Sequence, residues 1–139
     1  VSLHACDTAT DIVLTKAAQW HAKVILSTPC CHHALARVID CPELAFVTDH
    51  PFLSRKLCDV LTDAARLARL DAEGYVTTAM ELTDPDDTPK NVLLRAVLDD
   101  APDPSRLAAC RERYESIRRF LAAGDPEGAR GALPDVIYD

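Results

Sequence analysis

The sequence predicts an α/β fold: two parallel strands with a crossover helix, a long helix, a C-terminal antiparallel strand pair and a last helix. Two compact apolar runs at residues 1–6 and 23–28 flank a helical pattern, which is the order of a βαβ unit. Two further strand-like runs, at 75–82 and 91–98, are separated by a short connection rich in turn-forming residues. A connection that short favours antiparallel pairing, because parallel pairing needs a crossover of about a dozen residues or more.

Length and charge limit the class of protein. The chain has 139 residues, of which 48% are hydrophobic, so one domain with a sizeable core is expected and intrinsic disorder is not. No apolar run reaches the roughly 18 residues of a membrane span. The 15 basic and 22 acidic side chains give a net charge of −7. Such an acidic chain is a poor general binder of nucleic acid, whose phosphates need a surplus of Lys and Arg, although a local basic patch is compatible with this charge.

The first helix is expected to follow the first strand directly. Asp7 and Thr8 offer oxygens for its N-cap, and Asp11 completes an arrangement like a capping box. Four apolar residues then follow at helical spacing, up to about residue 21: Ile12, Val13, Ala17 and Trp20. The next run, 23–28, shows no polar alternation, as is typical of strands buried on both faces of a parallel sheet.

The strongest helical pattern begins at Pro51 and ends at Gly74, after a short helix at 34–39 and a connection at 41–51. Its expected buried stripe consists of Leu53, Leu57, Val60, Leu61, Ala64, Leu67 and Ala68. Its charged residues are expected on the other faces: Arg55, Asp59, Asp63 and Arg66.

A last helix is expected to begin after Asp103, with Pro104 in its first turn and Gly124 beyond its end. Its expected buried residues are Leu107, Cys110, Tyr114, Ile117 and Leu121. We expect residues 1–100 to form the α/β unit, with residues 101–139 as a helix and irregular tail packed on it.

Polar residues follow the first strand, where open α/β sheets place ligands. They are His4, Cys6, Asp7 and Thr8. A histidine can act as a general base and an aspartate can orient it. The alternative is structural: the aspartates and threonine only cap a helix, and the histidine packs in the sheet.

The second candidate segment ends the next strand, with the sequence Pro29, Cys30, Cys31, His32, His33. We expect it to form the floor of a pocket. Zinc binding by its cysteines and histidines is an alternative, but adjacent ligands rarely converge on one ion, so no metal site is expected. A cysteine nucleophile beside a histidine is another. A third candidate, Lys90 and Asn91, could point donors at a ligand or simply close a hairpin.

The cysteines indicate the cellular compartment, and the glycines indicate whether a phosphate-binding loop is present. No signal peptide opens the chain, so its six cysteines are expected to be reduced thiols in the cytoplasm. None of the glycines (Gly74, Gly124, Gly128 and Gly131) follows an early strand. These residues therefore contain no phosphate-binding loop.

Three motifs in this order, LHACDTATD, KVILSTPCCHH and DPDDTPKN-VLLRA, resemble the C-terminal half of a Rossmann-like, class I S-adenosylmethionine-dependent methyltransferase domain. The closer resemblance is to the group with Leu-His-x-Cys after the fourth strand and Pro-Cys-Cys after the fifth. It covers roughly residues 3–97. It implies that the chain's four strands are the fourth to seventh of a seven-stranded sheet, with the last one antiparallel and inserted between the fifth and sixth.

The resemblance also implies a function. S-adenosylmethionine would be the cofactor and methyl donor, and the acceptor would be RNA or a small molecule. His4 and Asp7 would orient or deprotonate the acceptor, and Cys6 and Thr8 would contact the donor. Pro29, Cys30, Cys31 and His32 would border the acceptor pocket, with Lys90 and Asn91 as further candidates.

The family's first three strands, with their Gly-rich loop and ribose-binding acid, have no counterpart in this sequence. The chain would then be a fragment, an engineered piece or a half-domain with another task. An exposed sheet edge predicts a homo-oligomer or docking of a missing N-terminal half. The rival interpretations are a non-enzymatic dimerisation or partner-binding module and, more weakly, a Cys/His metal protein.

Overall fold

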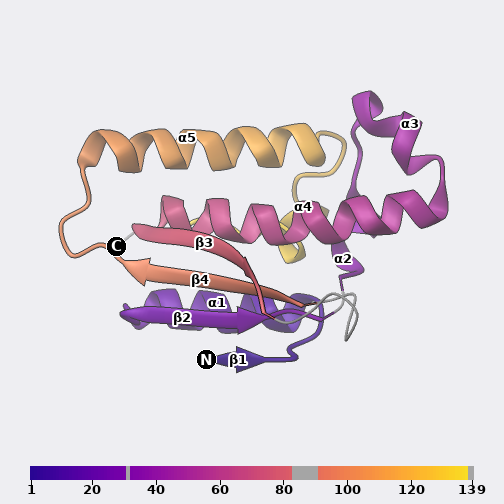
Figure 1. Ribbon diagram of the computed structural model, residues 1–139. Coiled ribbons are helices and arrows are strands. Elements are labelled where there is room, and N and C mark those ends of the chain that lie inside the picture. Colours follow the sequence, from indigo (N-terminus) through magenta and orange to yellow (C-terminus); the bar gives the residue numbers. More distant parts are fainter. Residues whose placement is uncertain (31, 83–90, 138–139) are drawn as a thin grey trace.

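The computed structural model describes residues 1–30, 32–82 and 91–137. The chain is an α/β protein, as predicted, with a mixed sheet and helices consistent with part of a Rossmann-like fold (Figure 1). In chain order the elements are β1 (Ser2–Leu3), α1 (Thr8–Gln19), β2 (Val24–Thr28), α2 (Ala34–Val38), the 3-10 helix η1 (Pro42–Leu44), α3 (Ala45–Thr48), α4 (Pro51–Ala72), β3 (Tyr75–Glu81), β4 (Val92–Leu98), α5 (Pro104–Leu121) and the 3-10 helix η2 (Gly128–Gly131).

The strand order of the sheet is β1-β2-β4-β3. β1 pairs with β2 in parallel, and β4 is antiparallel to both of its neighbours. The predicted antiparallel pair is confirmed, and so is the insertion of the last strand between its two predecessors. The first strand is shorter than expected, and the connection at 41–51 contains η1 and α3.

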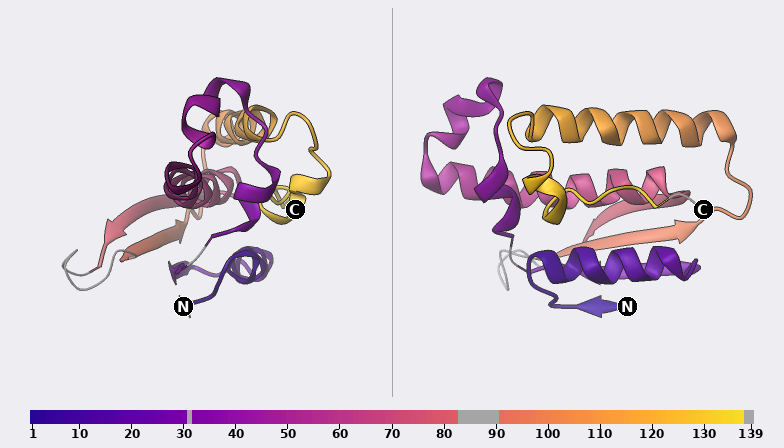
Figure 2. Two further views of the ribbon diagram at one scale, coloured as in Figure 1. Left: turned by 90° about the vertical axis from the view of Figure 1, so that its right-hand side faces the viewer. Right: turned by 180° about the vertical axis from the view of Figure 1, so that it is seen from behind.

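The helices lie on one side of the sheet. α1 is behind β2 in Figure 1 and in front of it when the molecule is seen from behind in Figure 2. α4 packs on β3 and is joined to α1 by the Arg66–Asp11 ion pair, and α5 runs along the outside of α4. Within the described chain no helix covers the opposite face, where Val24, Val76 and Met80 are 52%, 49% and 46% exposed.

Two apolar cores hold the layers together. The core between the sheet and helices α1 and α4 contains Leu14, Ala18, Ile25, Leu70, Tyr75 and Ala96. The second core lies between α4, α5, α2 and the C-terminal segment, and it includes Leu35, Cys58, Tyr114, Leu121 and Leu133. The segment after α5 is therefore irregular but packed, because Ala129, Leu133 and Val136 are all buried.

The buried face of α1 differs from the predicted one. Its buried residues are Thr10, Asp11, Leu14 and Ala18. Ile12 and Trp20, two of the apolar residues at helical spacing, are 62% and 78% exposed. The carboxylate of Asp11 lies on the buried face because the buried Arg66 of α4 donates hydrogen bonds to it.

The predicted face of α4 is also wrong in part. Arg66, expected on a polar face, is 3% exposed, whereas Val60 of the expected stripe is 67% exposed. Arg69 is buried as well, and it donates to Glu73, just after the end of α4, and to Thr15 of α1. In α5, by contrast, Tyr114 and Leu121 of the predicted stripe are buried, and Asp103 caps the helix by accepting from the Ser105 N–H.

None of the described helices combines the length and apolar character needed to cross a membrane.

Candidate functional site

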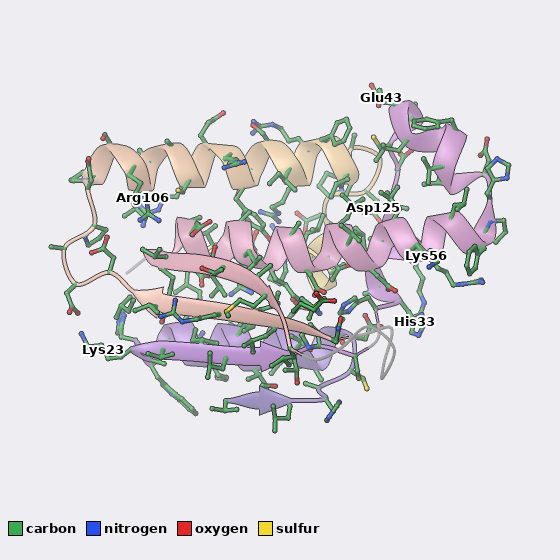
Figure 3. The ribbon with its side chains drawn as sticks, in the orientation of Figure 1. Lys23, His33, Glu43, Lys56, Arg106 and Asp125 are labelled. Atoms are coloured by element: carbon green, nitrogen blue, oxygen red, sulfur yellow. The ribbon has the colours of Figure 1, made fainter. Side chains whose placement is uncertain are left out.

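The loops after β1 and β2 meet at the carboxyl edge of the sheet. Leu3 lies opposite Thr28 in the parallel register, and the next amide, His4 N–H, donates to the Thr28 carbonyl at 3.2 Å. Beyond that bond the Sγ atoms of Cys6 and Cys30 are 3.1 Å apart. Figure 3 shows His33 at this end of the sheet and Lys23, which precedes β2, at the other. The structure therefore brings together the first two segments that the sequence singled out.

The loop between β1 and α1 has an unusual backbone. His4 and Asp7 have positive φ angles of 55° and 50°. For residues other than glycine such conformations cost on the order of 1–3 kcal/mol and persist where surrounding contacts enforce them. Here the Thr10 hydroxyl donates to the Ala5 carbonyl at 2.8 Å, and Arg66 donates to the Asp7 carbonyl at 2.8 Å. The loop is thus fixed from both α1 and α4.

Asp7 caps a helix, but not the helix that it precedes. Its side chain makes no capping bond to α1. Instead Oδ1 accepts from the backbone N–H groups of His33 and Ala34, at 3.1 and 3.0 Å, where α2 begins. Burial raises the pKa of this carboxyl, but the hydrogen bonds from Ala34 and His33 outweigh it and leave the pKa below its ordinary value. Asp7 is therefore an ionised group joining both loops of the site.

A buried charge network lies beneath the two loops. The Arg66 guanidinium bonds both carboxylate oxygens of Asp11, and its Nη1 lies 3.1 Å from Asp63 Oδ1 and 3.2 Å from His32 Nδ1. The side chains of Arg66 and Asp11 are 2% and 6% exposed. Burial lowers the pKa of Arg66, but the bonds and charges of Asp11 and Asp63 raise it overall, so the guanidinium stays charged.

His32 belongs to this network. Arginine carries only donors, so His32 Nδ1 accepts and the proton is on Nε2. Nε2 then donates to Asp63 Oδ1, 3.1 Å away. Both ring nitrogens of His32 are thus engaged by charged side chains, and the residue is 5% exposed. Sequence reasoning selected His32 but missed its partners Arg66 and Asp63 on α4, because nothing in a linear pattern links these residues.

The remaining candidates are distributed around this edge. Thr8 is exposed at the start of α1, Pro29 is buried and Cys30 is half-buried. Asn91 precedes β4, which runs antiparallel to β2, so it lies at the same edge, and its amide donates to Glu81 Oε1 at 3.2 Å. Cys31 and Lys90 lie outside the described residues.

Two other features bear on ligand binding. Among the described residues, which do not include Cys31, no three cysteine, histidine, aspartate or glutamate side chains are grouped so that they could hold a metal ion. A cavity of about 230 Å³ lies between α5 and the C-terminal segment, lined by none of the carboxyl-edge residues. Its three arginines are each paired with carboxylates: Arg118 with Glu115 and Asp135, Arg119 with Glu112, and Arg130 with Glu127.

Comparison with known proteins gives one match. A family model described as a methyltransferase domain matches residues 1–38. That span contains β1, α1, β2 and α2, with both loops of the carboxyl edge. No curated protein and no solved structure matches the chain.

Proposed function

We propose that this chain carries the C-terminal part of an S-adenosylmethionine-dependent methyltransferase, and that its carboxyl-edge loops form one wall of the site where the methyl group passes to an RNA or small-molecule acceptor. One observation carries the proposal: the 38 residues that match a methyltransferase domain contain both of these loops. Open α/β sheets bind ligands at this edge. The reversed strand β4, inserted between β2 and β3, supports the same conclusion.

The described residues fit part of a donor site. The hydroxyls of Ser27 and Thr28, at the end of β2, are buried without a hydrogen-bond partner within the described chain, so this edge holds polar groups that a ligand could satisfy. No glycine follows β1 or β2, however, and so no backbone cradle of the glycine-loop type is present in these residues. The other wall would come from polypeptide outside residues 1–139 or from a second copy.

The bound donor would supply an electrophilic methyl group, and the chain's own residues would position the acceptor. Asp7 fits a positioning role, since the backbone N–H groups of His33 and Ala34 hold its carboxylate through Oδ1. His4 is exposed in the same loop and is the candidate for removing the acceptor's proton. Cys6 and Thr8 would contact the donor, with Pro29 and Cys30 bordering the acceptor. The methyl acceptor supplies the nucleophile, so catalysis here is mainly orientation.

The test is a titration with S-adenosylhomocysteine, the reaction product, followed by calorimetry and by amide NMR of the 139-residue chain. We expect saturable binding with shifts confined to His4, Cys6, Asp7, Thr8 and the start of α2. Thr8→Ala, at a residue placed against the donor, should weaken binding, whereas Asp49→Asn, at an exposed aspartate after α3, should not.

If this chain alone gives no heat, the same titration on a chain extended at its N-terminus becomes the deciding one. In that active form Asp7→Ala or His4→Ala should reduce turnover sharply while the fold is kept. Absence of donor binding in the extended chain, or unchanged turnover in both variants, would contradict the proposal.

A second candidate function is a dimerisation module. The observation that favours it is the uncovered sheet face together with the outer edge of β1, where Val1 and Leu3 are 90% and 67% exposed. Exposed strand edges tend to pair with another chain. Sedimentation at micromolar concentration should then show a dimer that Leu3→Lys dissociates. A strictly monomeric chain would rule this candidate out.

A further inference from the structure

Two thiols from the loops that follow β1 and β2 are in contact at the carboxyl edge. The Sγ atoms of Cys6 and Cys30 are 3.1 Å apart, which is the distance of a thiol contact and not of a covalent bond. The residues are 24 positions apart in sequence, so the contact is made by the fold and not by the local chain. Nothing in the proposed methyl transfer requires two sulfur atoms to touch.

The sheet itself sets the separation of these cysteines. Each cysteine lies two or three residues beyond a paired position, because Leu3 is opposite Thr28 in the register of β1 and β2. Neighbouring strands are about 4.8 Å apart. A disulfide spans about 4.4–6.8 Å between Cα atoms, so loops leaving two adjacent strands side by side are at a suitable separation for one.

The pair is also accessible, unlike two of the other cysteines. Cys6 is exposed and Cys30 is half-buried. Cys41 and Cys58 are buried, and burial is the main cause that raises the pKa of each thiol. The thiolate is the nucleophile in cysteine oxidation, so Cys41 and Cys58 are poor competitors for an oxidant.

We propose that Cys6 and Cys30 form a redox-active dithiol, a site of reversible modification by hydroperoxides. The thiolate of Cys6 attacks one oxygen of the peroxide, the O–O bond breaks, and Cys6 becomes a sulfenic acid while water or an alcohol leaves. The Cys30 sulfur then attacks the Cys6 sulfur, the S–O bond breaks, and the hydroxyl leaves as water with the proton of the Cys30 thiol. Overall two thiols are oxidised to one disulfide, and the peroxide is reduced.

The disulfide would join the two loops that Asp7 already bridges through its bonds to His33 and Ala34. It would fix the loop of β1 onto that of β2 and remove both thiols from the edge. The chemistry depends only on the two sulfur atoms, so it stands or falls independently of methyl transfer.

The experiment is peroxide oxidation of the reduced 139-residue chain at low protein concentration, followed by alkylation, intact mass measurement and peptide mapping without reductant. We expect a single-chain mass lower by two hydrogen atoms, with the peptide containing Cys6 linked to the peptide at 24–37, and full reversal by dithiothreitol. No Lys or Arg separates Cys30 from Cys31, so variants must distinguish them.

Cys6→Ser and Cys30→Ser should each abolish the cross-link, whereas Cys31→Ser and Cys110→Ser should keep it. Circular dichroism of each variant shows that the fold is retained. The proposal is overturned if the cross-link survives Cys30→Ser, if it is lost in Cys31→Ser, if only double-mass species form, or if Cys6 proceeds to sulfinic acid without a cross-link.

Discussion

Arg66 of α4 and Asp11 of α1 form a bidentate ion pair, with Nε 2.9 Å from Oδ1 and Nη2 2.8 Å from Oδ2. Nη2 also donates to the Asp7 carbonyl at 2.8 Å. The same guanidinium therefore fixes the packing of two helices and the position of a strained residue in the candidate site. Damage to this pair should affect both stability and the geometry of the carboxyl edge.

Replacing Arg66 by methionine should destabilise the chain strongly. The side chain of Asp11 is 6% exposed and would be left as a buried charge without its partner. Removing one member of a buried pair costs about 3–5 kcal/mol. Urea unfolding should show this loss in the free energy of unfolding. The matched control is Arg119→Met, whose pair with Glu112 is exposed at both ends and contributes about 0–1 kcal/mol.

The double variant Asp11→Leu/Arg66→Met separates charge burial from packing. Apolar replacement of a whole buried pair is often nearly neutral. We therefore expect the double variant to be more stable than Arg66→Met alone. If the loss of unfolding free energy in the double variant equals the sum of the losses in the two single variants, Asp11 and Arg66 are not energetically coupled.

Asp7 should contribute to the acid sensitivity of the fold. Its pKa is lowered below the ordinary value of 3.8, because its backbone hydrogen bonds outweigh the effect of burial. A carboxyl with a depressed folded-state pKa adds stability above its unfolded-state pKa and loses it as the pH falls through the folded value. Asp7→Asn keeps an oxygen acceptor but cannot ionise.

The measurement is urea unfolding of both proteins at several pH values from neutral to acidic. The difference in stability between wild type and Asp7→Asn should shrink as the pH falls through this range. Asp49→Asn serves as the exposed control. A difference that is independent of pH would show that ionisation of Asp7 does not support the fold.

Tyr114→Phe should remove one buried hydrogen bond. The hydroxyl of Tyr114 donates to the Pro134 carbonyl at 2.8 Å and ties α5 to the C-terminal segment. Burial, the main cause, raises the pKa of this phenol far above its ordinary value, so it remains a donor at alkaline pH. A net loss of about 0.5–1.5 kcal/mol in the free energy of unfolding is expected. Equal unfolding free energies of wild type and Tyr114→Phe would show that this hydrogen bond does not stabilise the fold.

Trp20 gives a direct test of the rotation of α1. It is the single tryptophan of the chain and is 78% exposed. Iodide should quench its fluorescence nearly as well in the folded chain as in urea. Strong protection would mean that α1 is turned the other way. Protection that grows with protein concentration would point to a second copy covering it.

Sequence reasoning captured the features that depend on local patterns. Compact apolar runs, turn formers and caps predicted the strands, the long helix, the antiparallel pair and the capping of α5 by Asp103. It also selected the two loops of the carboxyl edge, since strand ends in a parallel unit must share an edge. It failed on the faces of α1 and α4, where apolar spacing predicted Trp20 inside and Arg66 outside.

The sequence by itself determined the class of fold, the order of its elements and the segments that hold the candidate site. Only the tertiary structure decided which side chains meet: Arg66 with Asp11, Asp7 with the start of α2, and Cys6 with Cys30. The physical reason is that the fold class and the order of elements depend on propensities and periodicities within a few residues. The meeting of these side chains depends on contacts across 24 to 55 positions, where a buried charge is tolerated only because its partner arrives from another helix.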